Sequence, residues 1–519
     1  MKRFLAILLC VVLVASAFTG CKKKEDKNKY KADGTLKEVV EVAVWNSGAG
    51  ITWLQKMIEV FNKKQDNYYI EYKESADSNA LTAALGMPDV DTVDLYMTTG
   101  KAQAEGWMEP LEEVILNATA EGDACTLGEK FLDGYMYLED GGEGHVYTLP
   151  FSGGPISLYY NTELFEKAGI TQLPRTTDEL TVVCDTLYSK KITPLCHFTG
   201  GGYYIYYMDL VQVQYDGLDY YLNNFYACTD ENGNSPSKSV FTTKDGRYQA
   251  FKAAEKFITP QYTLAGSNTK SHTEVQAEFV YDKAAMMING SWLENEVKST
   301  GEMDTFKVMK MPVISSITDK LTTVKSDSDL RKLITAIDEV TGGIKTEADF
   351  ASGEDYKVNG KVVSKADWDY VKTARNTLIA NYSAHDVFVP TYSDAKEGAF
   401  EFIKFMYSDA GYQIYVDELK APLPMNMSNG QQVDTSNMSP LQQSQFKLLQ
   451  TSTQIVNLGP AKKHAIWAAG ATMPILYISF ANSFSTYDAK YRQTADQLWE
   501  SMVKGIDEKW DIWVSQMKK

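Results

Sequence analysis

Aromatic and small polar residues stand at the ends of two predicted strands, where they can contact a ligand with flat apolar faces and hydroxyl groups. Trp45 ends a continuous apolar run, Asn46 and Ser47 follow it, and Tyr96 and Thr98 end a later strand. A pyranose offers C–H faces to aromatic plates and hydroxyls to amide, hydroxyl or carboxylate groups. Open α/β sheets bind ligands at the carboxyl edge of their strands. We therefore predict that these five residues contact a ligand at this edge of the sheet, and their chemistry is compatible with a carbohydrate; the alternative for Trp45 is a core residue that caps the sheet.

The elements that must position these residues alternate between strand and helix. Val39–Trp45 is β-branched and nearly continuously apolar, as in a strand buried on both faces. A turn at 46–50 leads to Thr52–Lys64, whose apolar residues recur at helical spacing, and strands follow at Tyr68–Tyr72 and Val93–Met97. This alternation predicts a doubly wound α/β lobe.

A second lobe is predicted to begin near the Pro- and Gly-rich segment 149–155. Helices are expected next at Thr162–Ala168 and Thr177–Ser189, and further along at 396–410 and 487–509. No internal repeat is visible.

Composition excludes some classes of partner. The chain has 519 residues and a net charge of −17, so nucleic acid and anionic membrane surfaces are not expected as direct partners. Aromatic residues make up 12% of the chain, which argues against disorder as its main state.

Motifs for metal binding or catalysis are absent from the sequence. The five histidines are scattered, with no HExxH, and no GxSxG or GxGxxG string occurs. The 68 acidic residues do not by themselves exclude the carboxylate pair of a glycosidase. Four cysteines follow Cys21 without a CxxC pair, so zinc ribbons are unsupported, whereas disulfides and free thiols fit equally well: Cys125, Cys184, Cys196 and Cys228.

The N-terminus is typical of an export signal. Lys2 and Arg3 precede the apolar run Leu5–Phe18, which is too short to span a bilayer comfortably. Small residues then lead to Cys21, and this arrangement resembles the lipobox of bacterial lipoproteins, in which the cysteine receives a diacylglycerol and becomes the new N-terminus. The Lys-rich segment 22–31 is expected to be a solvated tether. The alternatives are an uncleaved anchor or a secretory signal followed by a chance cysteine.

Three strings carry a resemblance to a known family. Residues 144–150, 158–170 and 174–180 read GHVYTLP, LYYNTELFEKAGI and PRTTDEL. They are similar to the "G-x-x-Y-x-x-P … YN-x-x-L-F-x-x-A-G-I … P-x-T-x-x-E-L" run of family 1 extracellular solute-binding proteins. Those proteins are the sugar-capturing lipoproteins of ABC importers and relatives of the maltodextrin-binding protein.

Two further segments agree with this family in type and order. Residues 277–292 and 395–413 read AEFVYDKAAMMINGSW and AKEGAFEFIKFMYSDAGYQ. The segment 316–390 is longer than the usual connection and is interpreted as an insertion with charged helices at 327–340 and 364–381, which decorates the surface, binds the permease or covers the mouth of the ligand cleft.

The resemblance implies a two-lobed α/β fold of the periplasmic-binding-protein type II class, with the ligand in the cleft between the lobes and one hinge crossing at 147–153. It implies the following division of the chain: 1–20 signal peptide, 21–36 tether, 37–150 N-terminal lobe, 151–312 C-terminal lobe, 313–394 return to the N-terminal lobe with the insertion, and 395–519 completion of the C-terminal lobe.

The resemblance also implies further ligand contacts. Trp292 matches a stacking tryptophan of the family, Tyr203 or Tyr204 matches an aromatic residue in the loop after Gly200–Gly202, and Trp467 lies where another plate often stands. The alternative for the tyrosines is a structural role in a half-buried element.

The function that the resemblance implies is binding of an extracellular carbohydrate, an oligosaccharide, and its delivery to the permease subunits of an ABC importer. We accordingly expect a monomer that is not an enzyme, needs no cofactor and is lipid-anchored on the extracytoplasmic face of the cell membrane. The alternatives are a carrier for a peptide, polyamine or metal, and a surface glycan-binding adhesin or sensor without import.

Overall fold

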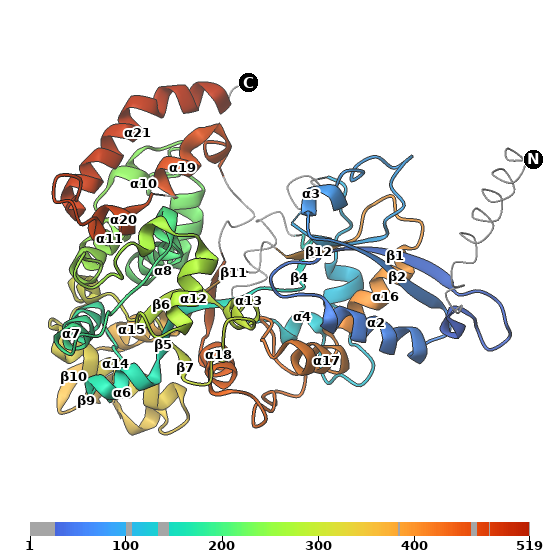
Figure 1. The fold of residues 1–519 in the computed structure, drawn as a ribbon, viewed down its shortest axis with the longest axis horizontal. Coiled ribbons are helices and arrows are strands. Elements are labelled where there is room, and N and C mark those ends of the chain that lie inside the picture. The colour runs from blue at the N-terminus through green and yellow to red at the C-terminus, as the bar shows by residue number, and fades with distance from the viewer. Residues whose placement is uncertain are drawn as a thin grey trace, which may run out of the picture.

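The computed structural model describes residues 26–99, 106–132, 145–381, 385–457, 464–476 and 478–517. The predicted signal peptide 1–20, Cys21 and the start of the tether lie outside these residues. The described part of the predicted solvated tether instead packs on the smaller lobe, where Lys29 Nζ pairs with Glu71 Oε1 at 2.6 Å and Tyr69 donates to Asp26 Oδ2 at 3.0 Å. The described chain forms two α/β lobes side by side (Figure 1), each with its own sheet and its own apolar core, so the predicted two-lobed architecture is confirmed.

The smaller lobe is built on a five-stranded sheet with the order β2-β1-β3-β12-β4. β1 pairs in parallel with β2 and β3, and β12 runs antiparallel between β3 and β4. The three strands predicted for this lobe are confirmed as β1, β2 and β3. The bounds are β1 Glu38–Trp45, β2 Tyr68–Ser75, β3 Leu95–Thr98, β4 Leu149–Pro150 and β12 Asp386–Phe388.

Helices cover the apolar side chains of this sheet. α2 (Thr52–Lys64) has the predicted bounds, and its apolar residues at helical spacing are buried, except for Val60, which is half-buried. α16 (Lys396–Tyr407) and α17 (Asp409–Leu419) pack against α2. The helix predicted at 396–410 is therefore interrupted at Ser408, whose Oγ accepts a hydrogen bond from Gly411 N at 3.1 Å and caps α17.

The larger lobe contains a second five-stranded mixed sheet, with the order β13-β11-β5-β6 and with β7 also paired to β5. Every residue of the central strand β5 is buried. The predicted helices α6 and α7 have the expected bounds, and Gly169 ends α6 with φ 76°. The strands are β5 Gly154–Asn161, β6 Met286–Gly290, β7 Phe306–Met309, β11 Thr377–Asn381 and β13 Gln454–Asn457.

The longer helices of the larger lobe are α6 Thr162–Ala168, α7 Thr177–Ser189, α8 Tyr204–Asp216, α11 Gly246–Phe257, α12 His272–Val280, α18 Pro440–Gln450 and α21 Ala495–Met517. The short helices of the two lobes are α3 Ser78–Leu81, α4 Leu127–Lys130, α9 Leu218–Tyr220, α10 Ser239–Thr242, α13 Leu293–Val297, α19 Thr472–Ile475 and α20 Phe480–Ser485. The periodic segment 487–509 thus forms a helix that starts later and runs further than predicted, since residues 487–494 precede it.

The insertion packs on the larger lobe. Both predicted helices exist, but the second is shorter than expected because residues 377–381 form β11. In Figure 1 the insertion lies at the end of the larger lobe that is remote from the smaller lobe. Its elements are α14 Asp327–Thr341, β8 Ala351–Ser352, β9 Asp355–Val358, β10 Lys361–Val363 and α15 Lys365–Asn376.

The start of α15 is fixed by local hydrogen bonds. Ser364 Oγ accepts from Asp367 N at 3.2 Å, whereas the Asp367 carboxylate accepts from Thr322 N and Thr323 N rather than closing a capping box. The carboxylate thereby ties α15 to the segment that precedes α14.

The chain passes between the lobes three times: at 151–153, between β11 and β12, and between α17 and α18. Residues 313–381, expected to return to the N-terminal lobe, contribute instead to the core of the larger lobe. Residues 395–419, expected to complete the C-terminal lobe, pack on the smaller lobe. The lobe to which a helix belongs depends on the sheet that its apolar face meets, and helical periodicity carries no such information.

Two carboxylates meet inside the larger lobe. Asp216 is the last residue of α8, and Asp245 precedes α11; Asp216 Oδ2 accepts from Gly246 N at 2.9 Å. Burial and then the proximity of Asp245 raise the pKa of Asp216, and burial also raises the pKa of Asp245. Lys320 Nζ stands 3.9 Å from Asp216 Oδ1, which does not offset the burial.

We expect the Asp216→Asn variant to reduce the pH dependence of folding stability. A carboxyl whose pKa is raised in the folded state stabilises the fold at pH below its unfolded value of 3.8, and this contribution is lost as the pH rises towards neutrality. Near pH 8, the free energy of unfolding of the variant should therefore be about 1–2 kcal/mol higher than that of the wild type. Near pH 4, the difference between the two should be much smaller. Urea denaturation at both pH values measures this.

Asp219→Asn, at an exposed carboxylate of the adjacent short helix α9, is the matched control and should follow the wild type at both pH values. Equal pH dependence in Asp216→Asn and the wild type would contradict the prediction.

The four cysteines after Cys21 are free thiols, three of them buried and Cys125 half-buried. Burial raises the pKa of Cys184, Cys196 and Cys228, which makes these thiols unreactive. In the part of the chain that the structure covers, no helix combines the length and apolar character that crossing a bilayer requires.

Candidate functional site

A cavity of about 320 Å³ lies between the two lobes. Its lining residues come from the loop after β1, from all three crossings, from the start of α8, from α13 and from α18. They are Trp45, Ser47, Gly48, Ala49, Ser152, Gly153, Tyr203, Tyr206, Ser291, Trp292, Glu294, Asn295, Glu296, His385, Leu419, Lys420, Ala421 and Gln445. Of the segment 316–390, His385 is the one residue in this lining, and no residue from α14 to α15 belongs to it, so these elements do not cover the cavity in this structure.

Trp45 forms the wall contributed by the smaller lobe. It ends β1, as predicted, and its Nε1 donates to Ala76 O at 3.1 Å. Its indole stacks on the His385 imidazole, with 4.9 Å between ring centroids and 14° between ring planes. Ser47 Oγ lies 3.1 Å from His385 Nε2, which fixes the imidazole beside the indole.

The facing wall comes from the larger lobe. Trp292 follows β6, and its ring meets the Tyr203 ring edge-on at 5.6 Å between centroids. Tyr203 stands at the N-terminus of α8, directly after Gly200–Gly202, three residues with positive φ that only glycine adopts readily. Tyr206, one turn later, also lines the cavity. Aromatic rings from both lobes therefore face one space.

Gly290 sets the position of the Trp292 indole. A Cβ at Gly290 would lie 2.2 Å from two ring carbons of Trp292, so the indole lies directly on the glycine backbone. We expect Gly290→Ala to displace this ring and to weaken ligand binding nearly as much as removal of the indole. The expected cost in folding stability is about 1–3 kcal/mol. Calorimetric titration and thermal denaturation measure the two effects.

Gly505→Ala is the matched control for Gly290→Ala, because a Cβ at Gly505 in α21 meets no atom within 4 Å. It should leave binding unchanged and raise helix stability by up to about 1 kcal/mol. Unchanged ligand affinity in Gly290→Ala would show that the glycine does not position the indole.

Charged side chains also line the cavity. Glu294 accepts two hydrogen bonds from Gln442 Nε2, and Glu296 Oε2 accepts one from Gln276 Nε2 at 2.6 Å. Burial raises the pKa of Glu294. Lys420, with φ 55°, lines the cavity from the third crossing. These groups can accept from and donate to ligand hydroxyls, and the two carboxylates can also pair with a ligand cation.

The lobes touch at one rim of the cavity. Asn295 Nδ2, on α13 of the larger lobe, donates to Gly48 O, in the loop after β1 of the smaller lobe. A Cβ at Gly48 would lie 3.1 Å from Glu296 Oε1, so the loop backbone fits closely against α13. This contact closes one side of the cavity.

Four of the residues predicted from the sequence line the cavity together: Trp45, Ser47, Tyr203 and Trp292. Asn46 is exposed, and its Nδ2 donates to Glu74 Oε2 at 3.2 Å. Tyr96 is fully buried in the sheet, with its hydroxyl bonded to Asp91 and its ring stacked on Phe388. Thr98 is fully buried as well. None of these three lines the cavity.

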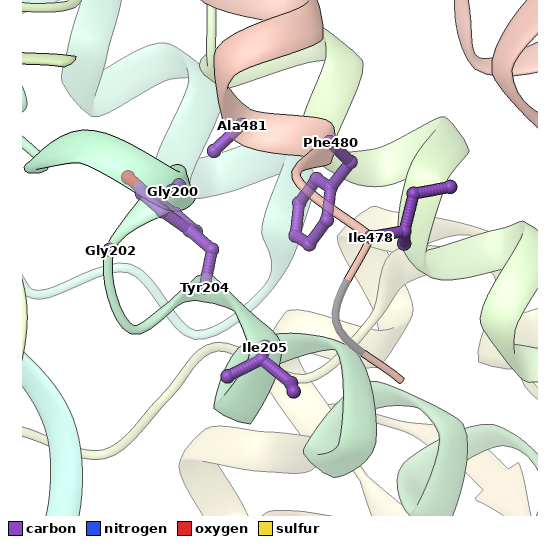
Figure 2. Close-up of a pocket in the computed structure, with 8 residues that line it drawn as sticks. Gly200, Gly202, Tyr204, Ile205, Ile478, Phe480 and Ala481 are labelled. Carbon is purple, nitrogen blue, oxygen red and sulfur yellow. The ribbon is translucent and has the colours of Figure 1, made fainter. Parts of the chain in front are cut away.

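Tyr204 and Trp467 lie elsewhere in the larger lobe. Figure 2 shows Tyr204 beside Gly200, Ile205, Phe480 and Ala481, around a second space of only about 50 Å³. Trp467 is 4% exposed and packs among Phe225, Tyr226 and Phe241, with its Nε1 bonded to Tyr226 O at 2.8 Å. The structure places both side chains in the core.

Residues that the sequence analysis missed complete the cavity. His385, Lys420 and Gln445 come from segments far from Trp45 in sequence, and only the crossings bring them there. Glu294 and Glu296 follow Trp292 on α13, and that proximity is the signal that could have found them. Among the described residues, no group of three or more His, Cys, Asp or Glu side chains is placed to hold a metal ion.

Two α/β lobes, joined by three crossings and enclosing a cavity, define the class of solute-binding proteins. Residues 45–413 match the model of one family in that class, described as "Bacterial extracellular solute-binding protein". The chain belongs to this family, whose members are binding proteins.

Curated relatives are found in Brucella. Proteins of Brucella abortus (strain 2308) and Brucella suis biovar 1 (strain 1330), named only as binding proteins, are 30% identical over 193 residues, or 35% of this chain. The chain spans 44% of the length of these relatives.

Solved structures share the fold at low sequence identity. A probable secreted solute-binding lipoprotein of Streptomyces coelicolor matches with a TM-score of 0.60 and 14% identity, over 90% of this chain and 98% of that one. RafE of Streptococcus pneumoniae matches with a TM-score of 0.57 and 13% identity, over 90% of this chain and 98% of that one. The GacH receptor of Streptomyces glaucescens matches with a TM-score of 0.56 and 15% identity, over 91% of this chain and 98% of that one.

Proposed function

We propose that this protein captures a carbohydrate, an oligosaccharide, in the cavity between its lobes and delivers it to an ABC importer. The observation that carries the proposal is the pair of aromatic walls. Trp45 from the smaller lobe and Tyr203, Tyr206 and Trp292 from the larger lobe line one cavity together with hydroxyl, amide and carboxylate groups. Apolar plates with polar groups between them match the faces and the hydroxyls of a pyranose.

Proteins of the same fold support this ligand class. The GacH receptor was solved in complex with acarbose, RafE with raffinose, and another relative is a chitin oligosaccharide binding protein. Each of them covers at least 90% of this chain. The transfer of their ligand class to this chain rests on the aromatic walls, because the sequence identities are low.

A thermal-shift screen with malto-, xylo- and manno-oligosaccharides tests the proposal. A ligand that binds only the folded state raises the melting temperature, by an amount that grows with its concentration. At least one oligosaccharide series should raise it, with a larger rise in the wild type than in Trp292→Ala. Peptides that raise it while every oligosaccharide fails would contradict the proposal.

A second candidate ligand is a polyamine or a basic peptide. Glu294 and Glu296 favour it, since two carboxylates line the same cavity as the aromatic rings and cations bind to both. Spermidine and a Lys-containing peptide therefore belong in the same screen. The polyamine alternative is preferred if spermidine raises the melting temperature and no sugar does.

Hinge motion at the three crossings would interconvert two states: an open state that releases the ligand and a closed state that encloses it. Small-angle scattering of the protein with and without its ligand tests this step. Compaction at saturation is expected, and identical profiles would contradict it.

The tether and the site of action follow from the N-terminus. We propose that Cys21 is lipidated and holds a monomer on the extracytoplasmic face of the bacterial membrane, where the permease subunits receive the ligand. Mass spectrometry of the mature protein should give an N-terminal peptide that starts at a diacylglyceryl-modified Cys21. Permease genes beside its own gene would favour import over an adhesin or sensor role.

A further inference from the structure

An aromatic stack runs from the cavity wall into the crossings between the lobes. It consists of Trp45, His385 and Phe151. The His385 imidazole lies nearly parallel to the Trp45 indole, at 4.9 Å and 14°, and meets the Phe151 ring edge-on at 5.5 Å. Trp45 belongs to the smaller lobe, whereas Phe151 and His385 stand in the first and second crossings. The stack thus connects a ligand-facing ring to the two segments in which the chain passes between lobes.

Hydrogen bonds hold His385 in this place. Its Nε2 lies 3.1 Å from Ser47 Oγ, and its backbone carbonyl accepts from Phe151 N at 2.9 Å. Strand pairs flank it on both sides: β12 with β4 in the smaller lobe, and β11 with β5 in the larger lobe. The imidazole therefore cannot shift without disturbing either the crossings or the loop after β1.

The chemistry of the imidazole fits a bracing role. Its Nδ1 is buried and has no hydrogen-bond partner among the described residues, so the ring contributes its flat face more than a second polar contact. Burial lowers the pKa of His385 to about 4, so the ring is neutral at ordinary pH. Glu294, Glu296 and Lys420 line the same cavity, and Asp386 is its neighbour in the chain. None of them forms an ion pair with it.

One face of the Trp45 indole is occupied by this imidazole. The indole is held at its edge by the bond from Nε1 to Ala76 O and lines the cavity while half-buried. A planar ring has two faces, so a ligand can stack only on the face opposite His385. The orientation of that face is set by the imidazole behind it.

We propose that His385 is a positioning residue. Its imidazole holds the Trp45 indole in the orientation in which a ligand can stack on it, and it connects the indole to the crossings. The role of Trp45 as a stacking plate rests on the proposed function. The role of His385 as the brace of Trp45 does not, because the arrangement of the two rings can be measured without a ligand.

A double-mutant cycle on ligand affinity tests whether His385 acts through Trp45. The oligosaccharide found in the thermal-shift screen is titrated calorimetrically into the wild type and into His385→Ala, Trp45→Ala and the double variant. We expect His385→Ala to weaken binding by about 10-fold, and to have less than about twofold effect once Trp45 is alanine. In a Trp292→Ala background, the matched control, the full loss on His385→Ala should persist.

The conservative variant separates bracing from folding. His385→Phe keeps a flat ring behind Trp45 and should bind within about threefold of the wild type, although it loses the bond to Ser47. Equal loss in His385→Ala with and without Trp45, or loss in His385→Phe as large as in His385→Ala, overturns the proposal.

A ligand-independent readout keeps the inference testable if no carbohydrate binds. The protein has 9 tryptophans, so labelling with 5-fluorotryptophan gives resolved ¹⁹F resonances, and the Trp45 resonance is assigned by its loss in Trp45→Phe. His385→Ala should shift or broaden that resonance, and His385→Phe should shift it less. An unchanged Trp45 resonance in His385→Ala overturns the brace. Failure of wild type to bind any sugar would count against the proposed function alone.

Discussion

Replacement of Trp292 by alanine is expected to weaken ligand binding by about 30-fold or more. The indole lies on Gly290, meets the Tyr203 ring edge-on and faces the cavity, so its loss removes a fixed apolar plate on which the proposed oligosaccharide would stack. Buried aromatic anchors of this kind typically contribute about 2 kcal/mol or more to binding, which corresponds to that factor. Isothermal titration calorimetry of the purified protein measures the dissociation constant directly.

Trp107→Ala provides the control for this prediction. Trp107 is 39% exposed on the smaller lobe, packs against Tyr392 and does not line the cavity. Its loss should leave the dissociation constant unchanged. Equal affinities of Trp292→Ala and the wild type would mean that the ligand does not stack on this wall.

Replacement of Lys130 by methionine is expected to destabilise the smaller lobe by about 3–5 kcal/mol. The ammonium of Lys130 is fully buried between Asp123 at 2.8 Å and Asp409 at 2.7 Å, and it also donates to Tyr407 O at 2.8 Å. Burial alone would raise the pKa of Asp409, but the hydrogen bonds from Lys130 and Ser428 keep it below its ordinary value. Methionine fills the space of the aliphatic stem and leaves Asp123 without its cation.

Thermal denaturation should show this loss as a fall in melting temperature of about 10 °C. Lys63→Met is the matched control, since Lys63 pairs with Glu59 on the exposed face of α2 and both side chains are about half exposed. Its expected cost is below about 0.5 kcal/mol. If the Lys130→Met protein is as stable as the control, the buried ion pairs of Lys130 do not stabilise the smaller lobe.

Local signals predicted the elements well where the deciding residues are adjacent in sequence. The bounds of α2, α6 and α7 follow from helical spacing and from terminators such as Gly169. Strand β1 follows from its β-branched run. In these segments, side-chain spacing and capping act within a few residues, so the sequence contains the necessary information.

The assignment of helices to lobes could not be predicted in the same way. α16 and α17 show the same amphipathic periodicity as helices of the larger lobe, yet they pack on the sheet of the smaller lobe. The three-residue strand β12 was missed because it is too short to show alternation. Both facts are decided by contacts between residues far apart in sequence.

The candidate site was predicted in part for a similar reason. The end of a strand was a sound guide for Trp45 and Ser47, which line the cavity. The same criterion wrongly included Tyr96 and Thr98 at the end of β3. Because β3 lies between β1 and β12, these two side chains are fully buried and do not reach the cavity. His385 and Lys420 enter the cavity only through crossings whose course no local pattern specifies.

The interleaved path of the chain has a consequence for its synthesis. The sheet of the smaller lobe needs β12, and the hydroxyl of Tyr392 bonds to Asp91, 301 positions earlier. The larger lobe likewise packs α21 (Ala495–Met517) against α11 (Gly246–Phe257), which lies far earlier in the sequence. Neither lobe can therefore complete its apolar core until these later segments have been synthesised. Truncation near residue 380 should leave both lobes unable to fold. Contacts between residues so far apart in sequence predict slow folding, during which apolar surface of both lobes stays exposed to aggregation.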